Sequence, residues 1–181
     1  MTTQHTSTLV RRTAAVAACA GLALFGTACH VSVGSTPIHK ASDIAAGECL
    51  TIDGGIGKTK VDASKSDCDT DGELTFYAAE TVPTSGSCSG SNSATLNFDK
   101  EANKLCMTPN FAAANCYQIP IPGGRLADYR KVDCDARAVG STVIAQLETR
   151  AGANIACTEE QTKWSFDKPE SIGYCLKEVV A

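Results

Sequence analysis

Short apolar and β-branched stretches, separated by polar turns, follow one another along most of the chain. Residues 74–78 and 142–147 are rich in β-branched and aromatic side chains, which is typical of central strands. Hairpins are predicted where short apolar stretches flank polar turns: 49–52 with Val61, 95–98 with 105–107, and 164–166 with 174–176. Residues 117–121, before the turn 122–124, repeat the first of these patterns. The pattern therefore predicts antiparallel strands over most of the chain.

Residues 151–161 differ from this pattern and are predicted to contain a short helical stretch, with Thr158 as its candidate N-cap. Together with the strands, this predicts a β-rich α+β fold. We expect small modules of antiparallel strands with short helices.

The cysteines divide into two matching sets of four. The gaps between Cys49, Cys68, Cys88 and Cys106 are 19, 20 and 18 positions, and those between Cys116, Cys134, Cys157 and Cys175 are 18, 23 and 18. The flanking residues also correspond: 67–69 to 133–135, Glu80-Thr81 to Glu148-Thr149, 96–100 to 164–168, and 105–107 to 174–176. This indicates an internal duplication, with a first module at 43–110 and a second module at 111–181.

Disulfides are the expected state of these eight cysteines, because a metal site would need closely spaced Cys-x-x-Cys pairs, which the sequence lacks. Four cysteines allow three connectivities in each module. We favour sequential pairing, since each pair would then bracket one hairpin: Cys49–Cys68, Cys88–Cys106, Cys116–Cys134 and Cys157–Cys175. Pairing of the first cysteine with the fourth and the second with the third is the main alternative. Each closed loop would stabilise the fold by about 3 kcal/mol.

The N-terminal residues have the order of an export signal. Arg11 and Arg12 precede an uncharged apolar run at 13–25, which is too short to span a membrane comfortably. Small residues then precede Cys29, and residues 25–29 resemble a bacterial lipobox. We expect a lipoprotein signal peptide at 1–28, a lipid-bearing Cys29 (a palmitate-type anchor) and a polar tether at 29–42. In the alternative, an ordinary secretory signal precedes Cys29 as the first cysteine of the folded domain.

Composition and charge exclude some partners. The chain of 181 residues contains ten cysteines, which favours an oxidising compartment. Its net charge is −4; removal of residues 1–28 takes away two arginines and no acidic residue, which leaves 14 basic and 20 acidic residues and a net charge of −6. Nucleic acid is not an expected partner, because phosphate binding needs concentrated Lys and Arg.

Three short sequence motifs resemble those of the LppU-type lipoproteins of mycobacteria and their actinobacterial relatives: 47–50 after Asp43-Ile44, 132–134, and 173–176. They are also similar to a wider septum-formation-like module, in which Gly-Asp-Cys opens the unit and a His often follows the second cysteine. Here Glu48 replaces that Asp, and no His follows Cys68 or Cys134. The resemblance implies an anchored envelope protein and brings no catalytic activity.

Candidate catalytic groups are few. The histidines at positions 5, 30 and 39 all fall in the predicted signal or tether, which removes the usual general base and metal ligand from the predicted modules. The pairs Asp67/Asp69 and Asp133/Asp135 are the remaining candidates for acid–base catalysis, and with Asp71 for loose calcium binding, but such acids beside a strand end are usually turn residues. Trp164 is interpreted as core, and the Ser-rich segment 85–93 as an exposed loop.

We therefore expect a membrane-anchored envelope lipoprotein on the extracytoplasmic face, with a non-catalytic binding module, no catalytic residues, no metal and no cofactor. Its partners would be the membrane through the lipid, and an envelope protein or the cell wall. Two alternatives stay open. One is an envelope hydrolase with paired carboxylates, which needs a cleft in which they face each other. The other is a lipid or small-molecule carrier, which needs a large apolar cavity between the modules.

Overall fold

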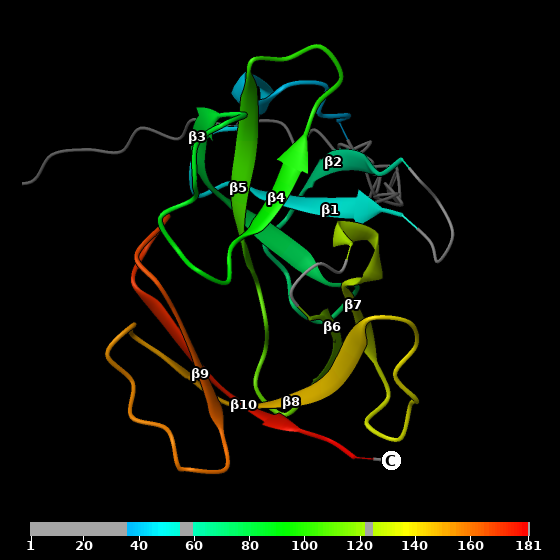
Figure 1. Cartoon of the computed structure of the whole chain (residues 1–181), viewed down its shortest axis with the longest axis vertical. Coiled ribbons are helices and arrows are strands. Elements are labelled where there is room, and N and C mark those ends of the chain that lie inside the picture. Colours follow the sequence, from blue (N-terminus) through cyan, green and yellow to red (C-terminus); the bar gives the residue numbers. More distant parts are fainter. Residues whose placement is uncertain (1–35, 55–59, 122–124, 181) are drawn as a thin grey trace, which may run out of the picture. The chain divides into compact units, whose positions relative to one another are not determined.

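Two antiparallel sheets of five strands each account for the regular structure in the computed structural model, which describes residues 36–54, 60–121 and 125–180 (Figure 1). The predicted signal peptide, Cys29, residues 55–59 and the predicted turn 122–124 lie outside the described residues. In the described part, no helix has the length and apolar character needed to cross a membrane.

The first sheet is formed by the first module. It has the order β2-β1-β3-β5-β4. Its strands are β1 (Cys49–Asp53), β2 (Asp62–Ser66), β3 (Thr75–Pro83), β4 (Ala94–Asn97) and β5 (Asn103–Pro109). A single 3-10 turn, η1 (Ala41–Asp43), precedes it among the described residues.

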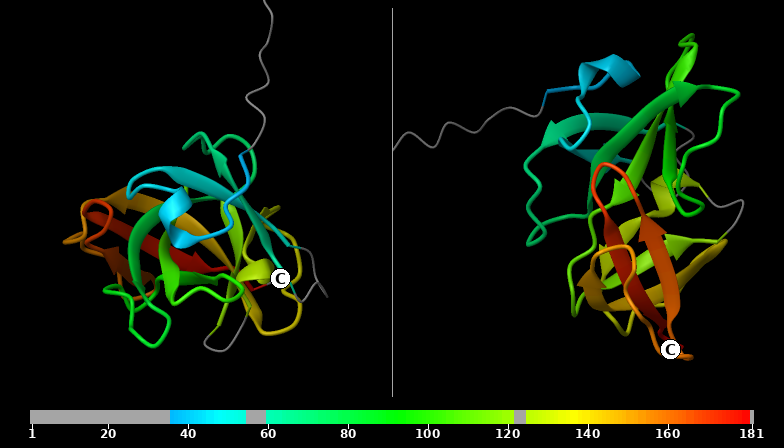
Figure 2. Two further views of the ribbon diagram at one scale, coloured as in Figure 1. Left: turned by 90° about the horizontal axis from the view of Figure 1, so that it is seen from above. Right: turned by 90° about the vertical axis from the view of Figure 1, so that its left-hand side faces the viewer.

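The second sheet repeats this topology in the order β7-β6-β8-β10-β9. Its strands are β6 (Cys116–Pro120), β7 (Arg130–Val132), β8 (Thr142–Ala151), β9 (Thr162–Phe166) and β10 (Ile172–Glu178), and the 3-10 turn η2 (Leu126–Asp128) precedes β7. The β9–β10 hairpin is seen from the side in the right-hand view of Figure 2. The predicted duplication and β-rich fold are confirmed.

A β-bulge corrects one of the predicted correspondences between the modules. Ala79 is the extra residue in the β3–β5 ladder, and Glu148 is the extra residue in the β8–β10 ladder. Cys106 lies opposite Glu80, and Cys175 lies opposite Thr149. Glu80 therefore corresponds to Thr149, and the alignment of Glu80 with Glu148 was wrong by one position.

The helical prediction for 151–161 was also wrong. Two tight turns occupy this segment, in which the N–H groups of Ile155 and Gln161 bond to the carbonyls of Gly152 and Thr158 at 3.0 and 3.1 Å. Between these turns, Cys157 is joined to Cys175 in the middle of β10. The disulfide thereby holds the segment at β10, an inner strand of the second sheet, in place of a helix.

The predicted tether ends earlier than residue 42. Pro37 forms a β-bridge with Ser64, and the N–H of Ile38 donates a 2.8 Å bond to the carbonyl of Ala63. Ile38 and Ala41 are 5% and 4% exposed and belong to the hydrophobic core. Residues 36–42 are therefore part of the folded unit, where they add to the edge of β2.

One hydrophobic core contains residues from both modules, and it includes Phe111 in the connection between β5 and β6. Phe111, in this connection, is fully buried, with ring centroids 4.4 Å from Tyr117, 5.3 Å from Tyr174 and 6.0 Å from Trp164. The hydroxyl of Tyr174 also donates a 2.7 Å bond to the carbonyl of Pro109. The modules are thus parts of one packed unit, which explains how units too small for a large core of their own become stable.

Candidate functional site

All eight cysteines of the two modules form the four sequential disulfides, with Cα–Cα distances between 5.1 and 5.8 Å. Cys49–Cys68 and Cys116–Cys134 close the β1–β2 and β6–β7 hairpins, as expected. The other two do not bracket a hairpin. Cys88–Cys106 and Cys157–Cys175 join the preceding loop to the middle of β5 or β10. Their role is to fix the long loops before β4 and β9.

The aspartate pairs lie on exposed turns after β2 and β7. A side-chain oxygen of Asp69 accepts a 2.9 Å bond from the N–H of Asp71, which is a turn-forming interaction. Among the described residues, no three His, Cys, Asp or Glu side chains are grouped so that they could hold a metal ion. His39, which was assigned to the tether, is exposed in the segment before η1.

The Ser-rich loop 85–93 is more ordered than its composition predicts. The N–H and the hydroxyl of Ser89 both donate 2.6 Å bonds to the same carboxylate oxygen of Glu80. A Cβ at Gly90 would come within 3.2 Å of the ring of Phe166, so the loop backbone lies against the second module there. The end of this loop consequently has a fixed position beside β9.

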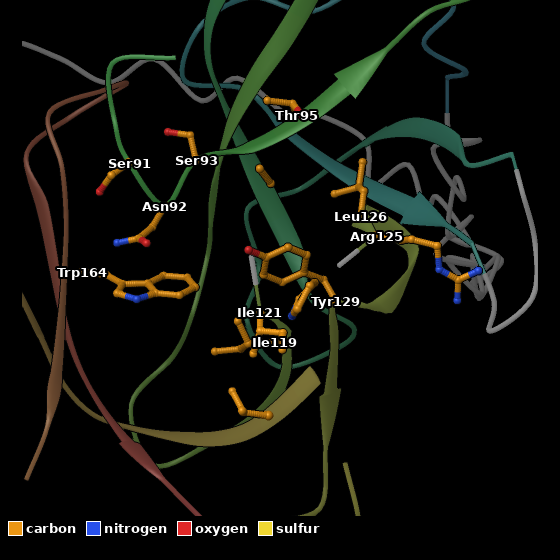
Figure 3. A pocket seen from close by; sticks show the side chains of 13 residues that line it. Ser91, Asn92, Ser93, Thr95, Ile119, Ile121, Arg125, Leu126, Tyr129 and Trp164 are labelled. Atoms are coloured by element: carbon orange, nitrogen blue, oxygen red, sulfur yellow. The ribbon is translucent and has the colours of Figure 1, made fainter. Parts of the chain in front are cut away.

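A groove of about 410 Å³ lies at this junction of the two modules (Figure 3). The first module contributes residues 91–95, at the end of the loop and the start of β4. The second module contributes side chains from β6, the η2 turn, β8 and β9: Ile119, Pro120, Ile121, Arg125, Leu126, Tyr129, Val143 and Trp164. A volume of this size is typical of sites for small ligands, which lie between about 300 and 1,000 Å³.

Two half-buried aromatic rings of the groove are held from behind by other rings. Tyr129 packs edge-on against Phe76 of the first module, with ring centroids 5.6 Å apart. Trp164 packs against Phe111 at 6.0 Å and Phe166 at 6.3 Å. Trp164 therefore contacts the core, as predicted, but it also lines the groove, which the prediction missed.

The η2 turn that carries Tyr129 is fixed by a buried amide. Gln118, 1% exposed, donates a 2.9 Å bond to the carbonyl of Asp128 and accepts a 2.6 Å bond from Arg130. The Asp128 carboxylate in turn accepts bonds of 2.8 and 3.1 Å from Arg125, which keep the pKa of Asp128 below its ordinary value. This network holds the ring of Tyr129 in place before any ligand arrives.

Several polar groups of the groove have no hydrogen-bond partner in the part of the chain that the structure describes. The side chains of Asn92, Tyr129 and Trp164 make no hydrogen bond with another described residue. In Figure 3 the Tyr129 hydroxyl points to the side on which Asn92 and Trp164 lie, whereas Arg125 extends away from them. Burial raises the pKa of Tyr129 to about 12, so this hydroxyl stays protonated and neutral at physiological pH.

The duplication is broken at this groove. The pairing of β9 with β10 makes Trp164 the counterpart of Leu96, which is 2% exposed in the first module. The registers of the β1–β2 and β6–β7 hairpins make Tyr129 the counterpart of Ala63, which is 5% exposed. Two small or buried aliphatic positions of the first module have thus become aromatic and accessible in the second.

Asn92 and Tyr129 could not be found as site residues from the sequence, since they are distant in the chain and belong to different modules. The comparison of the two modules was the available signal, because it pairs Leu96 with Trp164. Comparison of the whole chain with protein-family models, with curated proteins and with solved structures finds no match.

Proposed function

We propose that this protein is a membrane-anchored cell-envelope lipoprotein whose folded part is a non-catalytic binding module. In this proposal the lipid on Cys29 holds the protein at the extracytoplasmic face of the membrane. The groove between the modules, lined by Asn92, Tyr129 and Trp164, is the binding surface.

The location is supported by the sequence before the fold and by the cysteine chemistry. The small residues before Cys29 follow an apolar run of signal-peptide length. Disulfides persist in oxidising compartments, and four of them staple the two modules. The resemblance of 47–50, 132–134 and 173–176 to the LppU-type lipoproteins favours the same location.

The break in the duplication is the observation that carries the binding role. A duplicated fold needs no half-buried, partly accessible aromatic at a position where its other copy buries Leu96 or Ala63. Trp164 and Tyr129 occupy those positions, and their polar groups and the amide of Asn92 make no hydrogen bond with another described residue. Such a combination of aromatic faces and a few convergent polar groups is what binding sites present.

The geometry supports the two alternative functions less. A hydrolase with paired carboxylates needs two of them facing each other across a cleft, whereas the aspartate pairs lie on exposed turns. A lipid carrier needs an enclosed apolar cavity, whereas the groove is open and part of its wall is polar.

Anchoring is tested by expressing the full chain in a bacterial host with labelled palmitate. The wild-type chain should take up label and sediment with membranes, and Cys29→Ser should do neither. A wild-type chain without label would refute the anchor.

Binding is tested separately by co-sedimentation of the full chain with cell-wall fragments. We expect Trp164→Ala to lower the retained fraction at least several-fold, because it removes the largest aromatic surface of the groove. Val139→Ala, an exposed apolar residue that does not line the groove, is the matched control. Equal retention of wild type and Trp164→Ala would place binding elsewhere.

A further inference from the structure

We propose that the groove binds an uncharged oligosaccharide that carries hydroxyl and N-acetyl groups, as in the glycan strand of a cell wall. The inference rests on the proposed function and names the ligand class of that same site. It follows from the charge, the hydrogen-bonding groups and the aromatic faces of the groove, considered in turn.

The groove offers almost no net charge to a ligand. Its one charged side chain among the described lining residues is Arg125, and Asp128 neutralises that guanidinium through two hydrogen bonds. The hydroxyl of Tyr129 stays neutral. Charged ligands are recognised by unpaired charges of opposite sign, so this lining favours an uncharged ligand.

Together, the unpartnered polar groups of the groove offer a ligand both donors and acceptors of hydrogen bonds. The amide of Asn92 and the hydroxyl of Tyr129 can do either, and the indole N–H of Trp164 can only donate. Hydroxyl groups of a sugar have the same dual character, and the carbonyl of an N-acetyl group accepts from N–H donors. Polar groups in a partly desolvated groove gain most from a ligand that satisfies all of them.

The apolar surface of the groove suits the C–H faces and the acetyl methyl groups of such a ligand. The C–H groups on the face of a sugar ring are weakly positive, and the face of an aromatic ring is negative, so the two attract each other. Trp164 and Tyr129 provide rings, and the exposed Ile121 and the half-buried Val143 provide aliphatic surface for an acetyl methyl group. Because the groove is open, a chain longer than the bound sugars can extend from it.

A peptide is the competing ligand. β4 is an edge strand of the first sheet, and Ala94 and Thr95 at its start line the groove. An extended peptide could pair with that edge. Pairing through the backbone would not depend on the side chains of Asn92 and Tyr129, and this difference separates the two ligands.

The test is calorimetric titration of the full chain in detergent with N-acetylglucosamine oligosaccharides of two to six units. Tyr129→Phe removes one hydroxyl and Asn92→Ala one amide, and each should weaken binding roughly three- to tenfold, which is the effect of one hydrogen bond. Asn97→Ala is the matched control, since Asn97 is an exposed amide at the other end of β4 and does not line the groove.

Saturable binding that weakens in Tyr129→Phe and Asn92→Ala but not in Asn97→Ala would support the inference. The absence of binding to these oligosaccharides, with Trp164-dependent retention on cell-wall fragments intact, would overturn the sugar assignment and leave the proposed function standing. If oligosaccharide binding and Trp164-dependent retention on cell-wall fragments are both absent, the sugar assignment and the proposed function are both overturned. Binding of an extended peptide in place of the sugar, unaffected by Tyr129→Phe, would identify the β4 edge as the site and also overturn the inference.

Discussion

The guanidinium of Arg150, on β8 in the second module, donates a 2.8 Å hydrogen bond to the side-chain oxygen of Asn110, the last residue of the first module. The same guanidinium donates to the carbonyl of Phe111 at 3.1 Å and to the hydroxyl of Tyr77 at 3.0 Å. It also lies over the rings of Tyr77 and Tyr174, 5.8 and 5.9 Å from their centroids. One side chain thus links the β5–β6 connection to both sheets.

Replacement of Arg150 should therefore destabilise the whole folded unit. Arg150→Met keeps much of the side-chain length but leaves three acceptors without their donor, and we expect a loss of about 2–4 kcal/mol in the free energy of unfolding. Urea unfolding is the measurement. Arg137→Met, at an exposed position, should change the free energy by less than about 0.5 kcal/mol. Equal stability of the two variants would contradict the linking role of Arg150.

Gly173, in the sequence motif 173–176, has a steric reason to be glycine. A Cβ at this position would lie 2.5 Å from the carbonyl oxygen of Gly152 and 2.6 Å from a methyl carbon of Ile155. Gly173→Ala should lower the free energy of unfolding by about 1–3 kcal/mol, because backbone has to move. Gly152→Ala is the control, since its Cβ would meet only the Ser171 hydroxyl at 4.0 Å. Thermal unfolding of both variants measures this effect. A Gly173→Ala protein as stable as the wild type would refute the steric requirement for glycine at this position.

The ion pair between Glu80 and Lys168, 2.6 Å apart, joins the two modules and should give stability a pH dependence. Hydrogen bonds from Lys168 and Ser89 lower the pKa of Glu80 from 4.5 to about 2. Because the pKa is lower in the folded state, the unfolded state binds a proton first as the pH falls. The contribution of Glu80 is therefore complete above about pH 5 and is lost between about pH 5 and 2.

Glu80→Gln isolates this effect. Wild type should exceed the variant in free energy of unfolding by about 1–2 kcal/mol near pH 6, and the difference should shrink toward zero as the pH approaches 2. Urea unfolding at a series of pH values measures it. A difference that stays constant with pH would show that Glu80 does not titrate as described.

Most of the strands, the duplication and the favoured sequential pairing of the cysteines could be predicted from the sequence, whereas β2, which begins after the predicted Val61, and β7 were missed. Alternating apolar residues around polar turns define hairpins such as β4–β5, and cysteines at matching spacings mark equivalent positions in the two modules. The hairpins and the disulfides depend on residues within about twenty positions of each other, and the duplication is visible as a repeat in the sequence. The β-bulges at Ala79 and Glu148 could not be predicted, because a bulge changes the pairing of strands without a clear mark in the sequence.

The groove could not be predicted for a different reason. Asn92 and Trp164 are brought together by the packing of one module against the other, which no local pattern encodes. Trp164 was interpreted as core because a lone tryptophan beside Phe166 in a hairpin usually packs inward. Its ring does so on one side only, and the other side faces the groove.

Trp164 is the only tryptophan of the chain, so its fluorescence reports on the groove directly. The most direct test of the groove as binding surface is acrylamide quenching of this emission in the full chain, with and without a saturating amount of soluble cell-wall fragments. We predict that bound fragments shield the indole, so that the quenching constant falls at least twofold. An unchanged quenching constant in a chain shown by sedimentation to be bound would contradict it.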